Sequence, residues 1–92
     1  MRILFTLDPT ELWAVGCDPM QWLLLRYRRP KWRAVSFIGS KKVVLERVIG
    51  DLGINPTHFA RTTLKRLPDN FTEWLERERG EYVDWQNGEK EG

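Results

Sequence analysis

Within the first forty residues, apolar positions recur in short segments with the two-residue period of β-strands, and turn residues separate the segments. Ile3, Phe5 and Leu7 form the first apolar set, and this segment ends at Asp8-Pro9, a pair typical of turns. The same pattern, interrupted each time by turn residues, predicts four strands, over residues 2–7, 12–15, 21–28 and 32–38. Because the connections are short, we expect consecutive strands to pair as an antiparallel meander.

The spacing of apolar residues changes to the helical period after the fourth strand. Ser40 stands where the N-cap of a first helix is expected, and Gly53 is placed to end that helix. Asn55 and Pro56 are expected to be the N-cap and the first position of a second helix. A third helix is predicted over residues 70–79.

Four strands followed by three helices predict an α+β fold, in which a four-stranded antiparallel meander (ββββ) has three helices packed on one face. A chain of 92 residues can build one hydrophobic core but has no room for a second domain. We therefore assign residues 1–80 to a single domain. Residues 81–92 are predicted to be an acidic and partly disordered C-terminal tail.

The third and fourth strands are apolar on both of their faces, although helices on one side of a sheet can cover only one of them. We assign one alternating set to the core under the helices: Leu23, Leu25, Tyr27, Arg33, Val35 and Phe37. The open face is then expected to show the other set: Trp22, Leu24, Trp32, Ala34 and Ile38, beside Arg26 and Arg28. In the alternative interpretation the two faces are exchanged, or the tail folds over this surface.

Positive charge is concentrated where the third and fourth strands meet. Five basic residues and no acidic one lie between Arg26 and Arg33, and the formal charge is +7 over residues 1–68 but −5 over residues 69–92. The chain also has five Trp, a residue enriched together with Arg in the hot spots of interfaces. We predict a partner-binding surface made of Trp22, Arg26, Arg28, Arg29, Lys31, Trp32 and Arg33. The expected partner is a protein or nucleoprotein complex, and a homodimer through the open sheet face or edge is a further alternative.

Direct binding of DNA or RNA is the main alternative, because clustered cations contact phosphates and aromatic rings stack on bases. Residues 48–67 resemble a helix-turn-helix, although Ile49 stands where that motif has a small residue and Thr62 where it has an aliphatic anchor. An ordinary pair of packed helices explains the same pattern. The alternative nucleic-acid contacts are Lys41, Lys42, Arg61, Lys65 and Arg66.

Residues with catalytic potential are few. His58 is the only histidine and falls on the polar side of the second helix, and the single Cys17 excludes an internal disulfide or a multi-cysteine metal site. The sequence has no phosphate-binding glycine loop and no nucleophile elbow. We therefore expect a protein that is not an enzyme and uses no metal or cofactor. A chain without a signal segment or a membrane span is expected to be cytoplasmic.

Two runs, WRAVSFIGSKKVVLERVI (residues 32–49) and LPDNFTEWL (residues 67–75), together with the small Trp-rich fold, resemble accessory proteins of phages and other mobile elements. Among these, anti-CRISPR inhibitors are similar in size and style. The resemblance implies a non-enzymatic single domain that docks on a larger nucleoprotein complex. It also implies that Arg26, Arg28, Arg29, Lys31 and the Trp residues occlude a nucleic-acid path or a subunit interface.

Overall fold

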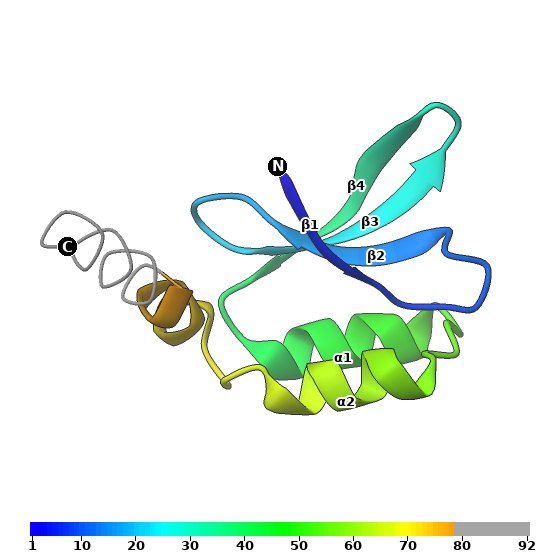
Figure 1. Cartoon of the computed structure of the whole chain (residues 1–92). Helices are drawn as coiled ribbons and strands as arrows, with labels where there is room; N and C mark the ends of the chain where they lie inside the picture. The colour runs from blue at the N-terminus through cyan, green and yellow to red at the C-terminus, as the bar shows by residue number, and fades with distance from the viewer. Residues whose placement is uncertain (79–92) are drawn as a thin grey trace, which may run out of the picture.

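The fold is a four-stranded antiparallel sheet with helices against one face (Figure 1). The structure is a computed structural model that describes residues 1–78. The strands neighbour one another in chain order: β1 (Arg2–Thr6), β2 (Trp13–Cys17), β3 (Trp22–Arg28) and β4 (Lys31–Gly39). They are followed by α1 (Lys42–Asp51), α2 (His58–Arg66) and a third helix over residues 71–78. The predicted α+β meander is confirmed, whereas the predicted boundary at residue 80 and the tail 81–92 lie outside the described residues.

The start of α2 differs from the prediction. Its N-cap is Thr57, whose side-chain oxygen accepts a hydrogen bond from the backbone N–H of Ala60 at 3.1 Å. The predicted cap, Asn55, instead accepts a hydrogen bond from the guanidinium group of Arg61 at 2.8 Å. Asn and Thr are both good capping residues, so local preference alone did not separate the two positions.

The start of α1 is set by a contact that is distant in sequence. Lys41 takes the cap position without a side-chain hydrogen bond and forms a β-bridge with Asn70. The backbone oxygen of the predicted cap, Ser40, accepts a hydrogen bond from the N–H of Phe71 at 2.6 Å. This bridge attaches the third helix to the start of α1. At the other end of α1, Gly53 has a φ of +69°, as expected of a residue that ends a helix.

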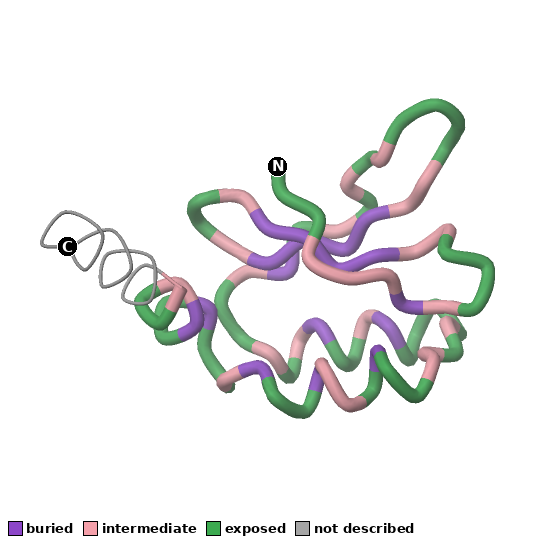
Figure 2. The backbone as a smooth tube through the Cα atoms, in the orientation of Figure 1, coloured by how far each residue is buried: buried purple, intermediate pink, exposed green. Residues whose placement is uncertain are grey.

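The main core lies between the sheet and the helices. From the sheet it takes Val15 and Cys17 of β2, Trp22 and Leu24 of β3, and Ile38 of β4. From the helices, and from the C-cap of α2 at Leu67, it takes Leu45, Ile49, Ala60, Leu64, Leu67, Phe71 and Trp74. The ring of Trp22 is fully buried, and it meets Phe71 edge-on at a centroid distance of 5.4 Å. Figure 2 shows this buried layer running along the centre of the sheet.

The predicted division of the sheet faces was wrong for β3. Leu23 and Leu25 are buried together with Ala14 in a small second cluster on the opposite face, where no helix residue within residues 1–78 joins them. Trp22 and Leu24 lie under the helices instead. The placement follows the neighbouring strand, because Gly16 of β2 leaves the space that the side chain of Leu25 fills.

The strand β4 divides between the two faces because its pairing with β3 is irregular. The register shifts between Leu24 and Leu25 and again between Trp22 and Leu23. Each shift adds one residue to β4 and reverses the alternation of its side chains. Trp32 and Ala34 therefore lie on the open face, as predicted, whereas Ile38 enters the main core. Val35 and Phe37, predicted to be buried, are 48% and 67% exposed.

Candidate interaction surface

The β3–β4 hairpin extends away from the helix layer and carries most of the predicted basic residues toward its tip (Figure 1). The residues from Arg28 to Lys31 are exposed, as is Arg33 on the returning strand (Figure 2). Arg26 is half-buried nearer the body of the sheet. The five cations that the sequence groups together are therefore also grouped in space.

Four of these cations share one face of the hairpin. The register places Arg26 opposite Arg33 and Arg28 opposite Lys31. Directly opposed residues in an antiparallel pair point to the same side, as do residues two apart along a strand. We call these four residues the basic face. It is on the helix side of the sheet, because Arg26 also lies opposite Trp13, which packs against the main core.

No carboxylate lies within ion-pair distance of the basic face in the part of the chain that the structure describes. The ion pairs of the described residues lie elsewhere, between Arg2 and Glu78, Lys42 and Asp69, and Arg77 and Glu73. Like charges that face each other across two strands destabilise the pair. The basic face contains two such pairs in succession, which concentrates four positive charges on one side of the hairpin.

The aromatic ring of Trp13 orients the innermost cation of the basic face. The guanidinium carbon of Arg26 lies 4.8 Å from the centroid of this ring, within the range of a cation–π contact. Sequence reasoning did not find Trp13 as a residue of the site. The contact depends on the β2–β3 register, and no local pattern around residue 13 indicated which β3 side chain it would face.

The opposite face of the hairpin is aromatic. The rings of Tyr27 and Trp32 lie 5.3 Å apart, and Trp32 also packs on the small cluster of Leu23, Leu25 and Ala14. Both rings are half-buried, and the exposed Phe37 lies farther along β4. The hairpin therefore offers a cationic side and an aromatic side, with the exposed Arg29 in the turn between them.

Trp22 does not belong to this surface, although the sequence placed it there. Its side chain is fully buried, and the indole also contacts the ring of Trp74 at a centroid distance of 6.5 Å. Its Nε1–H has no hydrogen-bond acceptor within residues 1–78. The structure thus brings together Arg26, Arg28, Arg29, Lys31, Trp32 and Arg33 on the hairpin and separates Trp22 from them.

The basic residues predicted as alternative nucleic-acid contacts differ in their exposure and in their hydrogen bonds. The Nζ of Lys42 donates a hydrogen bond to the backbone oxygen of Leu67 at 2.8 Å, and only 15% of this side chain is exposed. Arg61 donates to Asn55 and to the backbone oxygen of Pro56. Lys41, Lys65 and Arg66 are exposed. Lys42 therefore supports the end of α2 rather than offering a free charge.

The helices of the segment that resembles a helix-turn-helix are α1 and α2. They lie side by side and run in opposite directions in Figure 1. In a helix-turn-helix the two helices instead cross at a steep angle, near 90–120°. The bulky Ile49 is buried in the main core.

Within residues 1–78 the structure shows no group of three or more His, Cys, Asp or Glu side chains that could hold a metal ion. Burial raises the pKa of the Cys17 thiol, which disfavours the reactive thiolate. His58 is exposed at the start of α2. None of these residues forms an arrangement that indicates catalysis.

No family model, curated protein or solved structure matches the chain. In the described part of the chain, no helix is both long enough and apolar enough to cross a membrane.

Proposed function

We propose that the protein is a non-enzymatic interaction protein that docks on a host nucleoprotein complex through the β3–β4 hairpin and inhibits it, in the manner of the phage proteins it resembles. The single observation that supports this proposal most is the basic face. Arg26 opposes Arg33 and Arg28 opposes Lys31, with no carboxylate within ion-pair distance in residues 1–78.

The two like-charge pairs of the basic face destabilise the hairpin in the isolated protein. Each like-charge pair lowers the stability of the hairpin by about 0.2–1 kcal/mol, which a binding partner of opposite charge can offset. The phosphates of a nucleoprotein complex supply negative charge at close spacing. The aromatic face beside the cations offers Tyr27 and Trp32 for apolar contact with the protein part of such a partner.

Direct binding of DNA or RNA by the protein alone is the second candidate function. It is favoured by the closeness of the aromatic pair, Tyr27 and Trp32, to the exposed Arg29, because aromatic rings stack on unpaired bases while cations contact the backbone. Lys65 and Arg66 on α2 offer a different surface for the same activity.

The first experiment is a Trp-fluorescence titration with single- and double-stranded DNA and RNA of generic sequence, each at two salt concentrations. Binding that weakens steeply with salt supports the second candidate function. The variant Arg28→Gln/Arg29→Gln then reduces the salt slope by about two units if the hairpin makes phosphate contacts. The matched variant Lys65→Gln/Arg66→Gln, the α2 control, removes the same charge from α2. A slope that it leaves unchanged assigns the phosphate contacts to the hairpin, whereas a slope that it reduces assigns them to α2.

Absence of binding at low salt leads to a test of the nucleoprotein partner. The wild type, the Arg28→Gln/Arg29→Gln hairpin variant and the Lys65→Gln/Arg66→Gln control on α2 are each used to capture complexes from a bacterial lysate with and without nuclease treatment. A nucleoprotein complex that the wild type retains, and that the hairpin variant loses, supports docking through the hairpin. Equal capture by both proteins, or loss only with the α2 control, contradicts it.

A further inference from the structure

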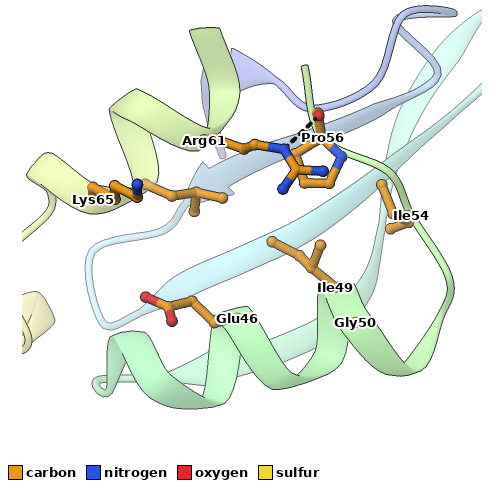
Figure 3. Close-up of a pocket in the computed structure, with 8 residues that line it drawn as sticks. Glu46, Ile49, Gly50, Ile54, Pro56, Arg61 and Lys65 are labelled. Atoms are coloured by element: carbon orange, nitrogen blue, oxygen red, sulfur yellow. Dashed lines mark hydrogen bonds between the residues drawn. The ribbon is translucent and has the colours of Figure 1, made fainter. Parts of the chain in front are cut away.

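A cleft of about 310 Å³ opens between α1 and α2, on the helix layer and away from the hairpin tip. Figure 3 shows its two walls, with Glu46 and Ile49 from α1 on one side and Arg61 and Lys65 from α2 on the other. Its other lining residues are Gly50, Ile54, Pro56 and Leu64. Its volume is at the small end of the range found for sites that bind small molecules.

The guanidinium group of Arg61 is held in place at this cleft. Its Nε–H donates to the backbone oxygen of Pro56 at 3.1 Å, and one Nη2–H donates to the side chain of Asn55 at 2.8 Å. These acceptors are uncharged, so the group keeps its full positive charge. Because the two bonds fix the planar group, a ligand does not have to order it on binding.

The charges around the cleft match a single negative charge. Arg61 and Lys65 contribute two cations, and neither lies within ion-pair distance of a carboxylate in the described residues. Glu46 lines the opposite wall, toward the Lys65 end of the cleft in Figure 3. The sum of the three charges favours a monoanion, and Glu46 disfavours a dianion such as a phosphate monoester.

The remaining lining is aliphatic and lies beside Arg61. Ile49, Ile54 and Leu64 form the apolar floor of the cleft. Ile49 and Leu64 belong to the main core and Ile54 packs against it, so this floor is rigid. A Cβ added at Gly50 meets no atom within 4 Å, so the space at this part of α1 is open. An apolar group several carbons long can therefore lie on the floor while an anionic group reaches Arg61.

From this geometry we propose that the α1–α2 cleft binds a small organic monocarboxylate, with its carboxylate on Arg61 and its short apolar body on Ile49, Ile54 and Leu64. A carboxylate matches the planar fork of a guanidinium group and can accept two of its N–H donors. The site is separate from the basic hairpin, so the proposal does not depend on the proposed function. Binding at this cleft and binding at the hairpin can be tested independently.

The test is an NMR titration of the full chain with sodium hexanoate, observing the methyl groups of Ile49, Ile54 and Leu64 and the Nε–H of Arg61. Saturating shifts at these positions are expected. Hexanamide has the same apolar body without the charge, and it should bind about tenfold more weakly or worse because it loses the charge-assisted hydrogen bonds. Equal binding of hexanoate and hexanamide, or no saturating shift with hexanoate, overturns the proposal.

Three variants locate the site. Arg61→Gln removes the anion contact and should weaken hexanoate binding about tenfold or more, whereas Arg66→Gln removes the same charge from an exposed position outside the cleft and should change little. Gly50→Leu fills the open space while replacing glycine with a better helix former, so it should block binding in a protein that is still folded. Unaltered binding by folded Arg61→Gln and Gly50→Leu variants contradicts the site.

Discussion

The side chain of Leu25 on β3 fills the space above Gly16 on the neighbouring strand β2. A Cβ placed on Gly16 would lie 2.5 Å from the Cδ1 of Leu25 and 2.6 Å from the backbone oxygen of Arg2. Gly16 does not need a positive φ, so close packing is the reason for glycine at this position. This contact explains why Leu25 is fully buried on the sheet face opposite α1 and α2.

Gly16→Ala should therefore destabilise the protein, by about 1–3 kcal/mol in urea unfolding, because a backbone oxygen cannot move aside as a flexible side chain can. Gly50→Ala is the matched control. Its new Cβ meets no atom within 4 Å, and alanine is the better helix former, so stability should rise by about 0.5–1 kcal/mol. Equal effects of the two substitutions would show that space above Gly16 is not limiting.

Arg33→Glu should separate stability from binding at the hairpin. The substitution turns the like-charge pair with Arg26 into an opposite-charge pair, and we expect the free energy of unfolding to increase by about 0.2–1 kcal/mol at low salt. The gain should shrink as salt is added. Binding of the anionic partner should weaken over the same salt range. A variant that is less stable than the wild type at low salt would contradict the repulsion between these pairs.

Replacement of the two Trp residues of the hairpin strands should have different effects. Trp22→Ala removes a fully buried ring and should lower stability by about 3–5 kcal/mol. Trp32→Ala should lower stability less, because its ring is half-buried, and should abolish partner binding at constant salt. Chemical denaturation measures the change in stability, and the titration or capture experiment described for the hairpin measures the change in binding. Undiminished binding by a folded Trp32→Ala variant would remove Trp32 from the interaction surface.

Asp8 should make stability depend on acid pH. Burial alone would raise its pKa, but hydrogen bonds from the Thr10 hydroxyl and the Trp13 N–H outweigh burial and hold the pKa below the ordinary value of 3.8. A lowered folded pKa gives stability that is present above the unfolded pKa and is lost as pH falls through the folded pKa. Asp8→Asn should cost about 1 kcal/mol at pH 7, a modest value because the group is partly solvated. The difference from the wild type should close below pH 4, and a difference that is constant with pH would exclude a role for the charge.

The cap of α2 can be tested with a pair of variants. Thr57→Ala removes the bond to the N–H of Ala60 and should cost about 1 kcal/mol of unfolding free energy. Asn55→Ala leaves this cap intact and removes only an exposed side-chain bond to Arg61, so its effect should be smaller. The reverse order would mean that Asn55 caps the helix, as the sequence pattern indicated.

Much of the candidate surface was predictable because it is local in sequence. The connection between β3 and β4 contains Arg29, and Arg28 and Lys31 flank it on the two strands. Any hairpin at this place therefore puts these three residues at its exposed tip. The contact between Trp13 and Arg26 was not predictable in this way. It joins residues of two different strands and depends on their register.

The sequence by itself determined the order of strands and helices, the antiparallel meander and the position of the basic hairpin, because these depend on apolar periodicity and on turn residues between neighbouring segments. Only the tertiary structure decided which face of β3 meets the helices. Both of its faces are apolar, so periodicity did not distinguish them. The choice came from the glycine on β2 that admits Leu25, from the two irregularities in β4 and from the aromatic contacts of Trp22 with Phe71 and Trp74. Close packing between distant segments, which no local pattern encodes, buried Trp22 and left Trp32 on the open face.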